Sequence, residues 1–294
     1  MSEAPIRGYF LDTSVMRSLL LSTQVYQQYL DIQLNKKELY ISNYVQMEIK
    51  RSYLVNIISF YFVLKMGGIN TIGDAFALWS NKFKGSELKA ILQVIPQLFN
   101  DRQLNFSNPK DKEKAISLLA IYIKRFNLVI KTKFKNTNDL TSCARALVQL
   151  DVDYDNPEPG FKKFLLEFRD TKTCRSQCQI DQFILVHYRD EVEQLLNVAS
   201  QLPRNTNTRG FLNIASNLKE ILAMDEKACD CKRCEKIGDA VIALNAPRNL
   251  RLEHTDSSFD YLCPSINQPH FKHPSENQVV MNISNVNLEN NFDE

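Results

Sequence analysis

The chain alternates between short apolar runs and longer segments with helical periodicity. Four runs predict strands: Tyr9–Leu11, Glu38–Val45, the segment RQLNFSNP, and LRLEHTD, which ends at Asp256. Apolar residues at a spacing of three and four predict helices between them, the first from about Ser14 to Leu30. Such alternation is typical of a parallel sheet covered on both faces by helices, with ligand sites beyond the carboxyl ends of its strands. We therefore expect an α/β fold.

The longest apolar stretch is YLVNIISFYFVL, from Tyr53 to Leu64. A helix needs about 20 apolar residues to cross a bilayer, so this stretch predicts a buried helix rather than a membrane span. The N-terminal text, MSEAPIRGYF, lacks a basic segment followed by an apolar core, so we expect no signal peptide and a cytoplasmic protein.

The middle of the chain has a different character. Helical patterns occur in GFKKFLLEF, DQFILVHYRDEVEQLLNVA and GFLNIASNLKEILA, and the strand–helix alternation returns with GDAVIALNAP. After Cys263 the sequence is rich in Asn, Pro and Ser and has little periodicity. We expect that final segment to be poorly ordered.

Four acidic residues stand at positions that could converge: Asp12 after the first strand, Glu48 in the helix after the second, Asp239 at the start of a late helix, and Asp256 after the late strand. Each has a structural explanation. Asp12 or Asp239 could cap a helix, Glu48 could be a solvated helix position, and Asp256 could form a turn. Taken together, the four suggest a common site.

The same positions resemble the motifs of the PIN-domain nucleases. The residues that carry the resemblance are YFLDTSV, YISNYVQMEI, GDAVIAL and EHTDSSF. The resemblance implies a PIN-like three-layer fold with a central parallel sheet, formed by residues 1–126 and 235–263. It leaves 127–234 as a largely helical insertion and 264–294 as a tail. It also implies that Asp12, Glu48, Asp239 and Asp256 bind the metal, supported by Thr13 or Ser14 and by Asn43.

Four crowded carboxylates repel one another, so they must take up protons or gather a cation. Oxygen ligands suit Mg²⁺ or Mn²⁺, and such ions can activate water and neutralise charge on a phosphodiester. We therefore expect a metal-dependent endonuclease, with single-stranded RNA favoured over DNA because of the family resemblance. Two alternatives are an inactive PIN-like scaffold that binds nucleic acid or protein, and a toxin-type ribonuclease held silent by an inhibitory protein partner.

Seven cysteines are present, and in a reducing compartment they are thiols or metal ligands rather than disulfides. The segments TCRSQC and ACDCKRC offer zinc-like spacing, and the preferred set is Cys174, Cys178, Cys231 and Cys234, with Cys229 as an alternative ligand. Such a zinc ion would fasten the helical insertion to the core. The alternative is a set of reduced thiols without metal.

The net charge of +2 is close to neutral, so nucleic-acid binding would require a local patch. The segment IKRFNLVIKTKFK supplies one candidate, whose basic residues are Lys124, Arg125, Lys131, Lys133 and Lys135. Phe126 and Phe134 alternate with them and could stack on unpaired bases. A solvated charged face is the alternative interpretation.

Overall fold

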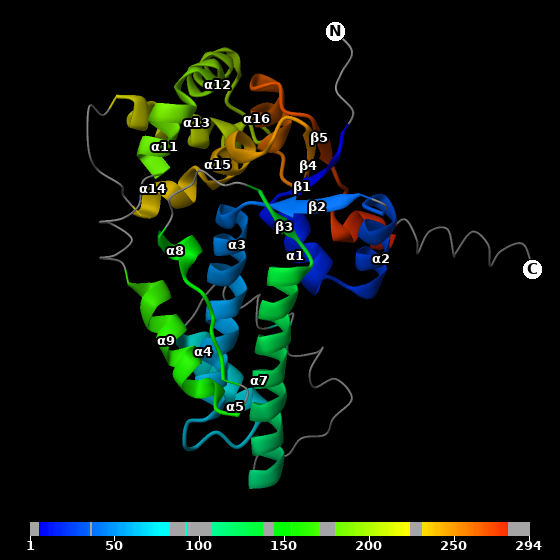
Figure 1. Cartoon of the computed structure of the whole chain (residues 1–294), viewed down its shortest axis with the longest axis vertical. Helices are drawn as coiled ribbons and strands as arrows, with labels where there is room; N and C mark the ends of the chain where they lie inside the picture. The colour runs from blue at the N-terminus through cyan, green and yellow to red at the C-terminus, as the bar shows by residue number, and fades with distance from the viewer. Residues whose placement is uncertain are drawn as a thin grey trace, which may run out of the picture. The chain divides into compact units, whose positions relative to one another are not determined.

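The structure is a computed structural model, and it describes residues 6–35, 37–82, 92, 94, 108–137, 144–153, 155–170, 180–223 and 231–281 (Figure 1). The side chains of residues 231–233 are outside this description. The chain divides into two compact units. The first contains residues 1–45, 134–146 and 171–294, and the second contains residues 46–133 and 147–170.

A five-stranded sheet forms the centre of the first unit, with the strand order β3-β2-β1-β4-β5 and every neighbouring pair parallel (Figure 1). The strands are β1 (Gly8–Leu11), β2 (Glu38–Ile41), β3 (Lys135–Asn136), β4 (Leu250–His254) and β5 (His270–Lys272). The predicted α/β class with a parallel sheet is thereby confirmed.

The two central strands come from near opposite ends of the chain. β1 pairs with β4 in a register that places Gly8 beside Leu250 and Leu11 beside Glu253. On its other edge β1 pairs with β2. A glycine is required at position 8, because a Cβ atom there would lie 2.8 Å from the Glu38 carbonyl oxygen and from the Tyr40 ring. Both strands run in the same direction, so both end at the same edge of the sheet.

Helices cover both faces of this sheet (Figure 1). On one face α1 (Thr13–Leu21) contacts β1 and β4, and α2 (Gln24–Gln33) packs against α1. On the other face α16 (Phe259–Ser265) contacts β5. The remaining helices of this group are α11 (Ile180–His187), α12 (Arg189–Gln201), α13 (Arg209–Leu222), α14 (Cys231–Lys236) and α15 (Gly238–Asn245), of which α12, α13 and α15 contact α16.

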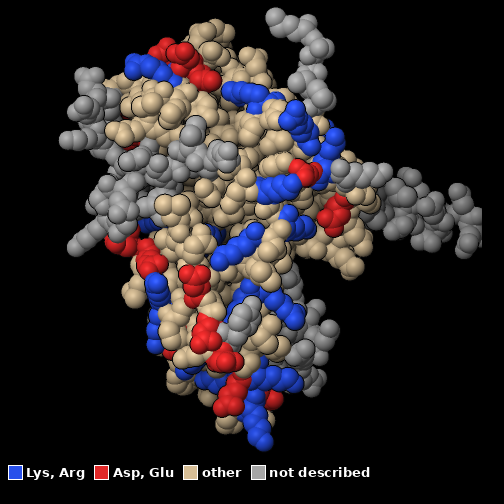
Figure 2. Space-filling model, viewed as in Figure 1, with Lys and Arg blue, Asp and Glu red and all other residues tan. Residues whose placement is uncertain are grey.

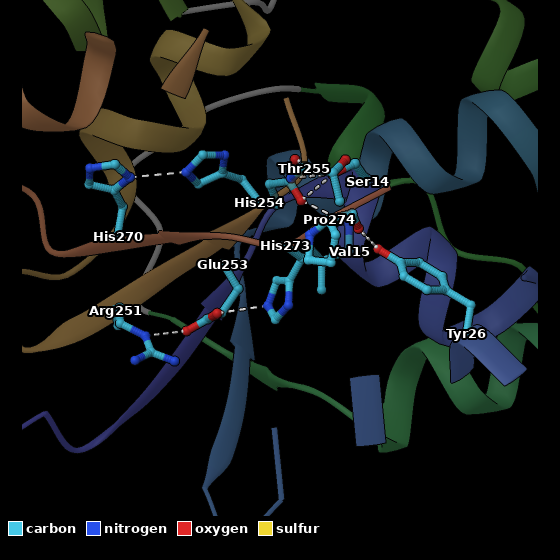
Figure 3. Close-up of polar contacts among 11 residues, drawn as sticks. Ser14, Val15, Tyr26, Arg251, Glu253, His254, Thr255, His270, His273 and Pro274 are labelled. Atoms are coloured by element: carbon cyan, nitrogen blue, oxygen red, sulfur yellow. Dashed lines mark hydrogen bonds and ion pairs between the residues drawn. The ribbon is translucent and has the colours of Figure 1, made fainter. Parts of the chain in front are cut away.

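A charged side chain lies inside the first unit. Glu253 on β4 is fully buried and accepts hydrogen bonds from Arg251 Nε at 2.6 Å and His273 Nε2 at 2.8 Å (Figure 3). The Arg251 guanidinium lies over the Tyr9 ring, 4.7 Å from its centroid, and over the Phe271 ring at 5.0 Å. A buried carboxylate is costly unless it is paired, so these contacts hold β1, β4 and β5 in one arrangement.

The second unit is helical and is organised around α4 (Val55–Leu64), nine of whose ten residues are buried. α4 contacts α5 (Ile72–Lys82), α7 (Pro109–Thr132) and α9 (Pro157–Arg169). Before α4 the chain forms α3 (Asn43–Ile49), which crosses the boundary between the units, and a π-helical turn, Lys50–Leu54; the short α8 (Ala144–Leu147) also crosses that boundary.

Aromatic pairs hold the helices of the second unit against α4. The Trp79 ring of α5 meets Phe60 edge to face, and Phe161 of α9 meets Tyr61 in the same way. The predicted buried helix at Tyr53–Leu64 is therefore confirmed. Within the described residues, no helix is both long and apolar enough to cross a membrane.

The division of the chain differs from the one expected. The described part of residues 127–234 is divided between the two units, because β3 returns the chain to the sheet and the helices of residues 180–222 belong to the same unit as the sheet. The separate helical unit instead begins at Gln46, inside the segment 1–126 that was expected to form the core. A two-residue strand leaves no periodic signal, so the sequence pattern could not reveal this return.

The expected disorder of 264–294 is wrong for its first part. Residues 270–272 form β5 at the edge of the sheet, and residues 276–281 are helical. His273 is buried against Glu253, and the Tyr26 hydroxyl donates to the Pro274 carbonyl oxygen at 2.6 Å (Figure 3). These contacts join residues far apart in sequence, which local composition cannot indicate. Residues 282–294 are outside the description, as is the segment RQLNFSNP over residues 102–107.

The buried Glu253 network leads to a prediction about stability. Glu253→Ala leaves Arg251 and His273 without their shared acceptor, and breaking a buried ion pair costs about 3 to 5 kcal/mol. We expect the free energy of unfolding, measured by urea denaturation, to fall by that amount. Glu38→Ala removes an exposed pair with Lys135 and serves as the control with a much smaller loss. Equal losses in the two variants would contradict the structural role of Glu253.

Candidate active site at the carboxyl ends of two strands

Asp12 follows β1 directly and is buried, with 3% of its surface exposed. Its side chain caps α1 by accepting a hydrogen bond from the Val15 backbone N–H at 2.8 Å. The Ser14 hydroxyl lies 2.8 and 2.7 Å from its two carboxylate oxygens. Burial and, to a smaller extent, the charge of Asp239 together raise the pKa of Asp12 to about 7, although the hydrogen bonds from Val15 and Ser14 lower it. Asp12 is thus a helix cap and also a perturbed carboxylate.

Asp239 and Asp256 are joined through one serine. Asp239 lies in the first turn of α15, and Asp256 lies in the loop between β4 and α16. The buried Ser258 donates its hydroxyl to Asp239 Oδ2 at 2.5 Å, and its backbone N–H donates to Asp256 Oδ1 at 2.9 Å. Ser258 therefore fixes both carboxylates, Asp239 at the start of α15 and Asp256 at the edge of the sheet.

A second link joins the ends of β1 and β4 (Figure 3). The Thr255 hydroxyl lies 2.7 Å from Ser14 Oγ, and the Thr255 backbone N–H donates to the same oxygen at 3.2 Å. Ser14 therefore accepts from the residue beside Asp256 and donates to Asp12. Three of the four predicted acids, Asp12, Asp239 and Asp256, thus belong to one connected region of the first unit.

Asp239 and Asp256 line a cavity of about 570 Å³. Other lining residues include Asn213 and Ser216 of α13 and Glu235 and Lys236 of α14. An adjoining cavity of about 470 Å³ shares Asn213 and Ser216 and is also lined by Arg204 and Arg209. An acidic pocket and a basic pocket therefore meet along α13.

Glu48 belongs to the second unit, on α3, where it is ion-paired to Arg51 at 3.7 Å. Its membership of the acidic set stays a prediction. Asn43 is the first residue of the same helix and lies on the first unit's side of the boundary. Of the two supporting residues expected near Asp12, Ser14 contacts its carboxylate directly.

The donor set of the three acids suits a hard divalent cation. Among the described residues, the one group of three metal-ligating side chains with donor atoms within 4.8 Å of one another is His254, Asp260 and His270, rather than the acids. Mg²⁺, however, commonly keeps several waters and uses only one or two carboxylates. The arrangement of Asp239 and Asp256 about one cavity fits that mode of binding.

The predicted basic stretch is divided between the two units, and its role in nucleic-acid binding stays a prediction. Lys124, Arg125, Lys131 and Lys133 belong to the second unit, whereas Lys135 lies on β3 in the first unit and is ion-paired to Glu38. The expected base stacking is wrong for both aromatic residues. Phe126 and Phe134 are buried, with 6% and 5% of their surfaces exposed, because their apolar rings pack into the core instead.

The cysteine site stays a prediction. Cys174, Cys178 and Cys229 and the side chain of Cys231 lie outside the described residues, and Cys234 is buried on α14. The Cys234 carbonyl oxygen accepts a hydrogen bond from the Tyr44 hydroxyl at 2.7 Å. Cys263 is buried, and burial raises the pKa of its thiol to about 12, which makes it unreactive at neutral pH.

Sequence reasoning missed the residues that connect and flank the acids. Thr255 and Ser258 stand on either side of Asp256 in HTDSSF, so their proximity was visible, but their bonds to Ser14 and Asp239 were not. Arg204 and Arg209 carry no motif. Only the packing of α13 beside the Asp239 helix reveals them.

The raised pKa of Asp12 predicts how stability depends on pH. Between the ordinary pKa of 3.8 and about 7 the folded protein binds more protons than the unfolded chain, so stability falls as pH rises through this range. Asp12→Asn retains an oxygen that can cap α1 and removes the free-energy cost of ionising a buried carboxyl group. In chelator at pH 8 we expect a gain of about 2 to 4 kcal/mol, since each tenfold change in proton affinity is worth about 1.4 kcal/mol.

The gain should shrink towards pH 4, where Asp12 is protonated in the folded protein. Urea denaturation across this pH range measures the effect, and Asp31→Asn, at an exposed position of α2, is the control. A variant that is less stable than the wild type at every pH would mean that capping is the dominant role of Asp12.

No protein-family model, curated protein or solved structure matches this chain. The resemblance to PIN-domain nucleases therefore depends on the four sequence motifs alone.

Proposed function

We propose that the protein is a metal-dependent endonuclease that hydrolyses phosphodiester bonds in nucleic acid. The observation that carries the proposal is the connected region of Asp12, Asp239 and Asp256 at the carboxyl ends of β1 and β4. This is the edge at which parallel α/β sheets bind ligands. One of its carboxylates is also perturbed as in many catalytic sites, since burial and the charge of Asp239 raise the pKa of Asp12 to about 7.

The PIN-like version of the fold is part of the same proposal. The α/β class with a parallel sheet is compatible with it, and the four motifs support it. The motifs imply Glu48 as a fourth acid, and its part in the site stays a prediction. RNA is favoured over DNA as the substrate because of the family resemblance alone.

The acids Asp239 and Asp256, with Asp12 behind them, would hold Mg²⁺ or Mn²⁺. Such an ion supplies an activated water and neutralises charge that develops on the phosphodiester. Ser258 fixes the orientation of Asp239 and Asp256, and Ser14 fixes that of Asp12. Because the hydroxyls and backbone N–H groups already point at these oxygens, little reorganisation is needed when the site is filled.

Arg204 and Arg209 supply positive charge in the cavity beside the acids. Both are exposed, and the Asn213 side chain belongs to the walls of both cavities. A nucleic-acid backbone that reached Asp239 along α13 would pass these two guanidinium groups, which bind phosphate well. Basic and acidic side chains are both visible on the face drawn in Figure 2, so the overall charge does not select a partner and local groups must do so.

Cleavage by purified protein tests the proposal. Wild type is incubated with single-stranded RNA and DNA in Mn²⁺, in Mg²⁺ or in chelator, beside Asp239→Asn. We expect metal-dependent cleavage that falls at least about 100-fold in Asp239→Asn, because a removed metal ligand weakens the site that stabilises the transition state. Asp31→Asn is the matched control and should retain full activity.

Other outcomes identify the alternatives. Binding of nucleic acid without cleavage in either metal would favour an inactive scaffold. Co-purification of a small protein, or toxicity in cells that Asp12→Asn relieves, would favour a ribonuclease held by an antitoxin. Cleavage that Asp239→Asn leaves intact would refute the assignment of the acids.

The basic cavity gives a second prediction. Arg204→Ala and Arg209→Ala should each weaken binding to labelled single-stranded RNA, measured by fluorescence anisotropy in chelator. Each should also reduce the slope of log affinity against log salt by about 0.7, the value for one lost contact to a single strand. Arg125→Ala, at an exposed position of α7 in the predicted basic stretch, is the control. A change in Arg125→Ala with none in Arg204→Ala or Arg209→Ala would mean that the basic stretch, and not the cavity beside the acids, carries the phosphate contacts.

A further inference from the structure

Two histidines and an aspartate meet beside β4 and β5, away from the acids' own side chains. His254 ends β4, His270 begins β5, and Asp260 lies in the first turn of α16. One donor atom from each lies within 4.8 Å of the other two. His254 is fully buried, and His270 and Asp260 are half-buried, so the group is open to solvent on one side.

The strand register brings the histidines together. Leu252 pairs with His270, and His254 lies two residues beyond Leu252, so both imidazoles project from the same face of the sheet. The rings stack with centroids 5.3 Å apart, and His254 Nε2 lies 3.0 Å from His270 Nδ1 (Figure 3). This geometry is fixed by the backbone of two neighbouring strands.

The tautomer of His254 is set by its other nitrogen. His254 Nδ1 lies 2.9 Å from the carbonyl oxygen of Asp256, and a carbonyl oxygen can only accept a hydrogen bond. Nδ1 therefore carries the hydrogen, and the lone pair of Nε2 points towards His270. A metal-binding histidine in proteins is typically held in this way, with its second nitrogen donating to a carbonyl or carboxylate.

Asp260 completes a set of three. Lys272 donates to its Oδ2, which leaves Oδ1 for another partner. Zinc lies about 2.0 to 2.1 Å from imidazole nitrogens, so two nitrogens that share a tetrahedral zinc ion stand about 3.3 Å apart. The two imidazole nitrogens are 3.0 Å apart, so a separation by about 0.3 Å would let them share an ion in place of a hydrogen. Two imidazoles and one carboxylate suit zinc or a similar transition metal, and they differ from the all-oxygen set of the acids.

We propose that His254, His270 and Asp260 bind one divalent transition-metal ion of the zinc type. Its remaining coordination position faces solvent beside the half-exposed His270 and Asp260. Because His254 is oriented by the Asp256 carbonyl, the ion would also brace the loop that carries Asp256. The site stands apart from the proposed nuclease activity, and its test does not depend on that activity.

The experiment uses the full chain without a histidine tag, stripped of metal by chelator and dialysed. Zn²⁺ is titrated by isothermal calorimetry in excess Mg²⁺, which occupies oxygen-ligand sites, and Co²⁺ is titrated by visible absorption. His270→Ala and Asp260→Asn should each lower the affinity of one zinc site by at least about 100-fold, since even groups behind the ligands contribute about 10- to 100-fold. His187→Ala, at an exposed position of α11, is the matched control.

A zinc ion held by the cysteines would remain in His270→Ala, so the number of ions lost per chain separates the two sites. Circular dichroism of each variant in chelator checks that the variant folds. If His270→Ala does not fold, Asp260→Asn alone still tests the proposal. Zinc stoichiometry and affinity that are unchanged in both folded variants would overturn the proposal. The two histidines would then form only a hydrogen-bonded pair between strands.

Discussion

The parallel pairing of β1 with β4 is the constraint on which the rest of the first unit depends. It places two strands from near opposite ends of the chain side by side, so Asp12 and the Asp256 loop follow strands that end at one edge. The close approach at Gly8 seats β2 against the other side of β1. The entropic cost of closing a loop grows only slowly with its length. The residues of the second unit can therefore stand between β1 and β4 in the sequence without preventing the two strands from pairing.

Two buried carboxylates, Glu253 on β4 and Asp12 directly after β1, show how partners decide the role of an acid. Glu253 faces an arginine and a histidine, and its buried charge is paired. Asp12 accepts hydrogen bonds from neutral donors, the Val15 N–H and the Ser14 hydroxyl, and lies near a second acid. A paired buried carboxylate fixes the fold, whereas one with neutral partners stays sensitive to protons and cations.

The short loop after β4 connects the three acids of the first unit with the two histidines. Thr255 bonds to Ser14 beside Asp12, and Ser258 bonds to Asp239 while its N–H bonds to Asp256. The Asp256 carbonyl accepts from His254, which reaches His270 on β5. The conformation of this loop therefore depends on the ends of β1 and β4 and on α15 and α16. A change at the histidines would reach the acids through the backbone of this loop.

The sequence alone determined the elements whose signal is local. The apolar runs at β1, β2 and β4 and the buried helix α4 could be predicted from their patterns, as could three acids at the ends or starts of such elements. Only the tertiary structure decided what depends on distant partners. β3 and β5 have two and three residues and no period of their own, so pairing with β2 and β4 defines them. For the same reason the basic cavity adjoining the acidic one, and His270 beside His254, could not be predicted: a residue's neighbours in space are set by packing and register, which no local pattern encodes.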